Sequence, residues 1–196
     1  MKKPSLLLLT TILILTACNN NKSKDGKAGS GKDKTTVDTI DIKTSDPEHE
    51  NEKQLEALQN LSPIPVDQLK ALIPGQILGA QRSDVDITSS LGANMASVKY
   101  KISDSAELNL DLYDCGGPGG SGVYNMQWLG MLQSREDETN TKIIDLKGGK
   151  AILETSTENT ETHLTYFSGG RYLVILEGIN MNADALKTVA SQLNIK

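Results

Sequence analysis

Four short segments between residues 141 and 179 constrain the fold of this chain most strongly. Each is rich in apolar residues, and in chain order they read TKIIDL, KAILETST, ETHLTYF and RYLVILEGI. Turns rich in Gly, Asn and Ser separate them, at residues 147–149, 158–160 and 168–170. This pattern predicts consecutive β-hairpins. The last segment is apolar on both faces from Leu173 to Leu176, which predicts a central strand that is covered on each side.

The remainder of the C-terminal part adds strands and helices to these hairpins. SVKYKI and AELNLDLYDC alternate apolar and polar residues around the turn Ser103-Asp104-Ser105, which predicts another hairpin, and QILGAQRSDVDI reads as a strand before it. Helices are predicted for VDQLKALIP, VYNMQWLGMLQ and NADALKTVASQLN, the last capped by Asn182. The sequence therefore predicts an α+β fold: a single domain with an antiparallel sheet of about 6–7 strands and about three packed helices.

The buried stripes of two helices can be read from their spacing. Apolar residues recur at helical intervals in both segments, namely Tyr124, Trp128, Met131 and Leu132 in one and Leu186, Val189, Ala190 and Leu193 in the other. Each set forms one face that can lie on a sheet.

The N-terminus has the composition of a secretory signal. Lys2 and Lys3 precede an apolar run from Leu6 to Ala17, and Cys18 follows. The run is too short to span a bilayer, which takes about 20 apolar residues. The tetrad Leu15-Thr16-Ala17-Cys18 resembles the lipobox of bacterial lipoproteins, which implies that the Cys18 sulfur receives a diacylglycerol before the signal peptide is removed. Asn19 stands where an Asp would imply retention in the inner membrane, so the resemblance favours the outer membrane.

The chain divides into three parts on composition. We expect a lipoprotein signal peptide at residues 1–17, a lipidated Cys and a flexible polar tether at 18–60, and an α+β domain at 61–196. The tether is mostly Lys, Asp, Ser, Thr, Gly and Glu, which cannot bury enough apolar surface to fold. Within it, EHENEKQLEALQNL can form a short helix, which we expect to be transient or weakly docked.

The C-terminal half carries a second resemblance. A helix, a hairpin ending in RYLVILEG and a closing helix ending in SQLN resemble the Mog1/PsbP-like fold of small secreted and lumenal domains. The likeness spans residues 97–196 and has no diagnostic motif. It implies a binding or assembly module and brings no catalytic residues.

Charge argues against nucleic acid as a partner. Removal of the signal leaves 18 basic and 25 acidic side chains, a net charge of −7. Residues 61–196 hold 11 basic groups against 16 acidic ones, whereas a protein that binds a phosphate backbone needs clustered Lys and Arg.

The stretch GPGGSG, residues 117–122, matches the dinucleotide spacing G-x-G-x-x-G. However, AELNLDLYDC before it alternates like a half-exposed antiparallel strand, whereas a dinucleotide loop follows a parallel strand buried on both faces. Val123 also stands where a Walker-type loop has its Lys and where a G-x-S-x-G elbow has its last Gly. We therefore expect a flexible strand-to-helix turn, no bound nucleotide and no cofactor.

Two side chains could carry chemistry. Cys115 ends a predicted strand just before a helix, and His163 lies on another strand, so a Cys115–His163 pair would make a small thiol hydrolase. The simpler interpretation is a buried apolar thiol and a surface imidazole. A calcium loop needs several oxygen ligands and a glycine that turns the chain. Neither the pair Asp84 and Asp86 nor the acidic run from Arg135 to Glu138 has this pattern, so no metal site is predicted.

Taken together, these features predict an outer-membrane lipoprotein that faces the periplasm or the cell surface. Its lipid attaches it to the membrane, and its domain is expected to be non-enzymatic and to bind an envelope protein or a small ligand. The alternative is the thiol hydrolase that would use Cys115 and His163.

Overall fold

The computed structural model describes residues 47–90, 92–134, 140–156 and 160–196. The helices are α1 (Pro47–Gln59), α2 (Val66–Ala71), α3 (Gly117–Val123), the π-helical η1 (Tyr124–Leu129), α4 (Gly130–Ser134) and α5 (Ala183–Gln192). The strands are β1 (Gln76–Ile77), β2 (Ala80–Gln81), β3 (Asp86–Ser90), β4 (Ala93–Lys101), β5 (Glu107–Asp114), β6 (Thr141–Leu146), β7 (Gly149–Thr155), β8 (Glu161–Ser168) and β9 (Tyr172–Ile179). Among these described residues, no helix is both long and apolar enough to cross a bilayer.

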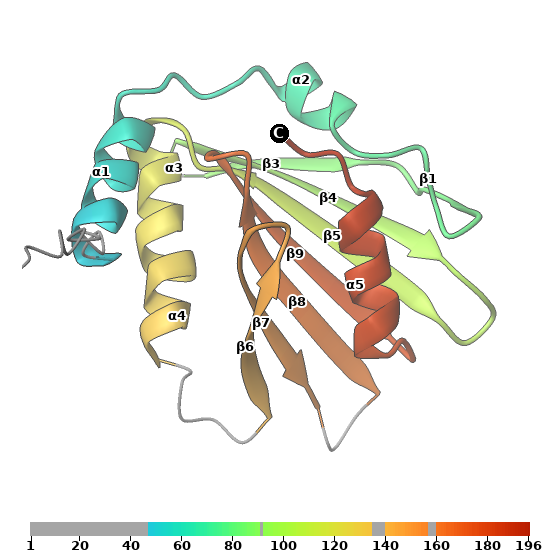
Figure 1. Cartoon of the computed structure of the whole chain (residues 1–196). Helices are drawn as coiled ribbons and strands as arrows, with labels where there is room; N and C mark the ends of the chain where they lie inside the picture. Colours follow the sequence, from blue (N-terminus) through green and yellow to red (C-terminus); the bar gives the residue numbers. More distant parts are fainter. Residues whose placement is uncertain (1–46, 91, 135–139, 157–159) are drawn as a thin grey trace, which may run out of the picture. The chain divides into compact units, whose positions relative to one another are not determined.

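A seven-stranded antiparallel sheet forms the centre of the domain (Figure 1). Its order is β3-β4-β5-β9-β8-β7-β6, and β1 and β2 form a separate two-stranded ribbon. The predicted α+β class and antiparallel sheet are confirmed. The central position of β9 is confirmed as well, because β9 pairs with β5 and β8 and its Leu173, Val174 and Leu176 are fully buried.

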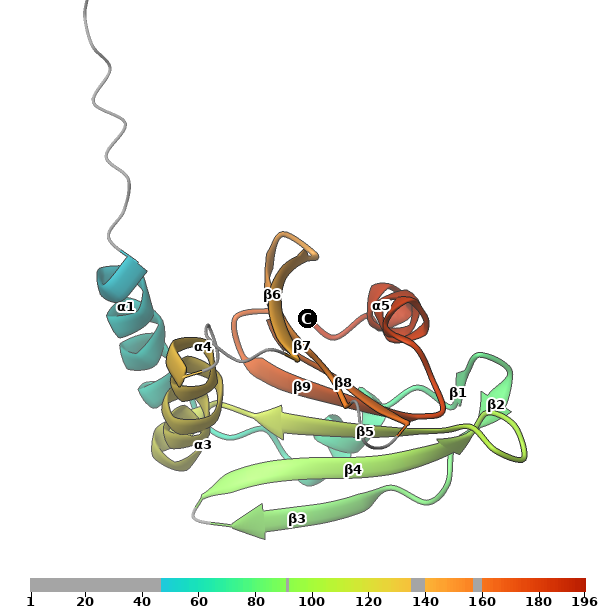
Figure 2. The same cartoon turned by 90° about the horizontal axis from the view of Figure 1, so that it is seen from below.

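Helices cover the two faces of this sheet (Figures 1 and 2). Helices α2 and α5 lie on the first face, over a core that includes Leu69, Tyr100, Leu110, Leu176 and Leu186. Helix α5 has the predicted Asn182 cap, whose Oδ1 accepts from the Ala185 N–H at 2.9 Å, and the predicted stripe is buried. Helix α1 and the continuous segment α3–η1–α4 lie on the second face, over a core made of Leu58, Cys115, Tyr124, Trp128, Ile152 and Leu173.

Helix α1 packs more closely than the sequence suggested. Leu58 is fully buried in the second core, Leu55 packs beside it, and Gln54 Nε2 donates to the Gly170 carbonyl at 2.9 Å. The helix therefore belongs to the folded unit and not to a polar tether that continues to residue 60. Its few apolar residues suffice because they fall on one side and meet the apolar face of α3 and η1.

The expectation of a flexible turn at GPGGSG was wrong, because these residues form the first turns of a helix that begins at Gly117. Pro118 lies in the first turn, where its fixed φ and missing N–H suit a helix start. The glycine at 120 serves close packing: a Cβ there would lie 2.5 Å from the Asp114 carbonyl oxygen. The helix can start this near the end of β5 only because the residue has no side chain.

The strand expected over QILGAQRSDVDI is also different. This segment is divided into β1, β2 and the start of β3, because Leu78 and Gly79 adopt positive φ angles of 49° and 85° and turn the chain. Strand β4 begins at Ala93, four residues earlier than SVKYKI suggested, since Gly92 (φ 81°) makes the turn from β3. The acidic run 135–138 and part of the turn 158–160 lie outside the described residues.

Candidate functional site

Among the described residues, the helices on the second face of the sheet cover only half of it. Side chains from the half near Asp114 and Tyr172 are apolar and pack under α3 and η1, as Tyr113, Leu173 and Phe167 do. The other half is polar. We call it the open face and define it by Asp86, Ser97, Lys99, Asn109, Asp111, Glu161, His163 and Glu177.

Strand register arranges the open face in rows, because directly paired residues point to the same side of a sheet. One row runs through Asp86, Ser97 and Asp111 on β3, β4 and β5. The next row runs through Lys99, Asn109, Glu177 and His163 on β4, β5, β9 and β8. Glu161 precedes His163 by two residues, so both side chains point to the open face.

Hydrogen bonds fix several of these side chains in place. Ser97 Oγ donates to Asp111 Oδ1 at 2.6 Å, and Asn109 Nδ2 donates to Glu177 Oε2 at 2.8 Å. The Lys99 ammonium donates to Glu107 Oε1 at 3.1 Å. These bonds hold the carboxylates of Asp111 and Glu177 in defined positions, so the open face has a fixed pattern of acceptors.

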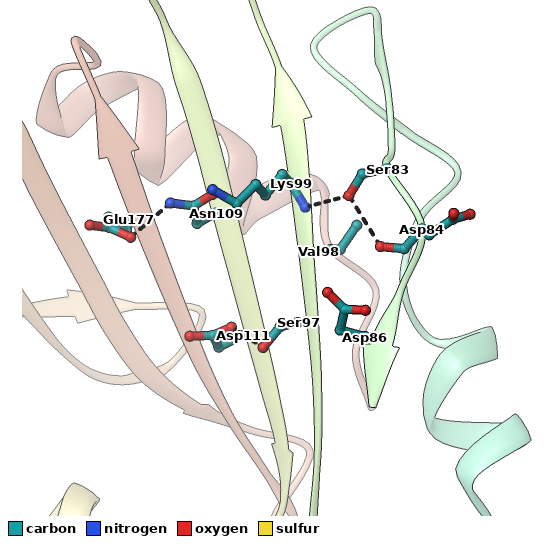
Figure 3. A pocket seen from close by; sticks show the side chains of 9 residues that line it. All are labelled: Ser83, Asp84, Asp86, Ser97, Val98, Lys99, Asn109, Asp111 and Glu177. Atoms are coloured by element: carbon teal, nitrogen blue, oxygen red, sulfur yellow. Dashed lines mark hydrogen bonds between the residues drawn. The ribbon is translucent and has the colours of Figure 1, made fainter. Parts of the chain in front are cut away.

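A shallow pocket of about 260 Å³ lies at the β3–β4–β5 side of the open face (Figure 3). Its walls carry four carboxylates and one ammonium group, from Asp84, Asp86, Asp111, Glu177 and Lys99. Asp84 and Asp86 are exposed, as expected, but they border this pocket. An excess of acids in a depression attracts cationic groups, whether on a small molecule or on the surface of another protein.

At the β8–β9 side, the open face brings Glu161, His163 and Glu177 together. One ligating atom from each lies within 4.8 Å of the others, and His163 Nε2 is 3.9 Å from Glu161 Oε2. This cluster was not predicted, because in the sequence His163 looks like a lone imidazole. The sequence did indicate one contact of the cluster. His163 and Glu177 are the same number of residues away from Gly170, so the predicted hairpin around the 168–170 turn places them opposite each other.

Cys115 and His163 are not brought together. Cys115 follows Asp114 at the end of β5, whereas His163 lies in the row of Asn109, which is six residues before Cys115. At about 3.4 Å per residue this is about 20 Å along the strands. Cys115 is also fully buried, and burial raises the pKa of its thiol to about 12. This geometry lacks the thiolate–imidazole contact that a thiol hydrolase needs.

The end of β5 beside the glycines holds a buried ion pair. Asp114 is fully buried and accepts from Arg171 Nε at 2.7 Å, from the Ile64 N–H at 2.7 Å and from the Gly116 N–H at 3.0 Å. Arg171 Nη2 also donates to the Ser62 carbonyl at 2.7 Å. Through these hydrogen bonds the ion pair holds the segment between α1 and α2 at the end of the sheet. Its role is therefore structural.

A second pocket, of about 320 Å³, lies between the β3–β4 hairpin and the α3–η1 segment. Its lining is mostly apolar and includes Ala93, Met95, Val123 and Met126, of which Met126 is 70 % exposed. It offers room for a small apolar ligand and has no ionisable side chain other than Tyr113.

Comparisons with known proteins identify no family for this chain. Neither family models nor curated proteins match the chain. A GTP binding regulator from Thermotoga maritima, known from a crystal structure at 1.75 Å resolution, is similar over 64 % of this chain and 84 % of its own, with a TM-score of 0.40 and 16 % identity. A likeness at this level supports no conclusion about function.

Proposed function

We propose that this protein is a bacterial lipoprotein held at the outer membrane by lipid on Cys18, with a non-enzymatic domain that binds a partner through the open face. The partner class is an envelope protein or a small ligand that presents cationic groups. Nucleic acid and nucleotides are not expected, since the domain is acidic and its glycine-rich segment is helical.

The lipobox resemblance of Leu15-Thr16-Ala17-Cys18 supports the anchoring part of this proposal. Lipid chains contribute about 0.8 kcal/mol for each buried methylene, and two lipid signals already give stable attachment. The polar stretch after Cys18 would let the domain move near the membrane while it stays attached.

The open face is the observation that carries the binding part. Sheet faces of small domains are ordinarily covered by helices or by a second sheet, yet here ordered polar side chains occupy a half that no described helix covers. Exposed residues of both strand rows contribute, including Asp86 and Lys99. A fixed, acidic and slightly concave surface suits recognition of a positively charged partner.

Site-specific photo-cross-linking in living cells tests the proposal. A photoreactive amino acid at Asp86 on the open face is compared with the same amino acid at Asp184 on α5, because both are exposed aspartates on opposite sides of the sheet. We expect a discrete cross-linked product from position 86 only. Products of equal yield from both positions, or from position 184 alone, would contradict binding through the open face.

A further inference from the structure

We propose that Glu161, His163 and Glu177 bind one divalent transition-metal ion of the zinc class. This proposal deepens the proposed function and rests on it, because it names one kind of cation that binds to the open face. The ligand set itself follows from strand geometry and is independent of the lipid anchor.

The backbone places the three ligands without any special loop. Glu161 and His163 are alternate residues of β8, so they share a face, and Glu177 is the direct partner of His163 on β9. Their ligating atoms lie within 4.8 Å of one another. Ligands of a tetrahedral zinc site, with bonds of about 2.0–2.2 Å, lie roughly 3.4 Å apart. Small side-chain rotations therefore close the set around an ion.

Asn109 supplies a second, independent observation. Its Nδ2 group holds Glu177 Oε2 at 2.8 Å, which orients this carboxylate from outside the ligand set (Figure 3). Its Oδ1 atom is inaccessible to solvent and points away from Glu177, towards Lys99 on β4 (Figure 3). Asn109 therefore has the place of an outer partner that orients a ligand, as is common in metal sites.

Charges around the cluster favour a cation. Glu154 on β7 is the direct partner of His163, so it adds a further carboxylate from that side. Lys99 lies in the same row, but its ammonium is bonded to Glu107 at 3.1 Å. One imidazole with two carboxylates suits zinc, manganese or cobalt, whereas calcium takes six to eight oxygen ligands.

Metal titration of the full chain tests this site. The chain carries Cys18→Ser so that the Cys18 thiol does not compete for the ion, has no polyhistidine tag and is held in mild detergent. Zn²⁺ binding is followed by calorimetry, and Co²⁺ binding by its visible absorption, which reports coordination geometry. The matched control is His49→Ala, because His49 is the other histidine of the chain and lies 3.9 Å from Glu52 on α1.

We expect one ion per chain, a loss of at least tenfold in affinity in His163→Ala and in Glu177→Gln, and no change in His49→Ala. Asn109→Leu should weaken binding by about 10-fold to 100-fold, as is typical of outer partners. Absence of stoichiometric binding, or binding that His163→Ala leaves intact, would overturn the metal site. If the ion binds as expected but position 86 gives no cross-link, the metal site stands and partner binding through the open face fails.

Discussion

Two glycines of the α3 segment should respond in opposite directions to the same substitution. A Cβ added at Gly120 would lie 2.5 Å from the Asp114 carbonyl oxygen and 2.5 Å from the Cys115 carbonyl carbon, both backbone atoms. A Cβ at Gly122 would meet no atom of the described residues within 4 Å. Both glycines are helical, so alanine gains about 0.5–1 kcal/mol of helix propensity at either position.

The steric cost decides the outcome at Gly120. Overpacking ordinarily costs about 1–3 kcal/mol, and backbone atoms yield less readily than side chains. Gly120→Ala should therefore lower the free energy of unfolding by about 2 kcal/mol, whereas Gly122→Ala should raise it by about 0.5–1 kcal/mol.

Urea unfolding followed by fluorescence measures both changes, because Trp128 is the one tryptophan of the chain and is buried beside this helix. Shifts of the same sign and size in the two variants would refute the close approach of the helix start to β5.

Three further outcomes follow from buried groups. Arg171→Leu should lower the free energy of unfolding by about 3–5 kcal/mol, because it leaves the buried Asp114 carboxylate without its cationic partner. Lys150→Leu breaks the exposed pair of Lys150 with Asp145 and should cost about 0.5 kcal/mol or less. A similar cost in both variants would contradict the burial of the Asp114–Arg171 pair. Cys115 should not react with a thiol reagent in the native protein and should react fully after unfolding, and rapid native labelling would show that the thiol is accessible. Burial raises the pKa of Tyr100 from 10.0 to about 12 and that of Cys115 from 9.0 to about 12. Both folded values exceed the unfolded ones, so the stability that these two groups contribute should be complete below about pH 9 and should be lost between pH 9 and 12. Thermal melts measure this loss, and a melting temperature that is the same at pH 9 and pH 11 would contradict the burial of these groups.

Much of the sheet could be predicted because alternation and turn residues determine it locally. The hairpins on either side of the turns at 147–149 and 168–170, the central β9 strand and the capped helix α5 follow from patterns within about ten residues. The turn at Leu78 and Gly79 was harder to predict, since a non-glycine residue with positive φ leaves no strong mark in a sequence.

Features that depend on distant contacts were missed. Helix α1 looks polar by itself, and its docking becomes evident only when Leu58 meets the core under α3. GPGGSG resembled a turn because glycine usually lowers helix propensity, whereas here Gly120 is required by contact with β5. The open face could have been partly inferred, because the β8–β9 register follows from the 168–170 turn. Its completion by Asn109 could not, since that depends on which strand lies beside β9.

Membrane attachment through Cys18 is the claim on which the proposed function depends most, because it sets the compartment and the possible partners. Metabolic labelling with palmitate, followed by fractionation of cells that carry the native chain or Cys18→Ser, tests it directly. We expect the native chain to incorporate label and to sediment with outer membranes. The variant should take up no label, and it should stay uncut or be released in soluble form. A Cys18→Ser protein that is still labelled and still sediments with outer membranes would contradict the account.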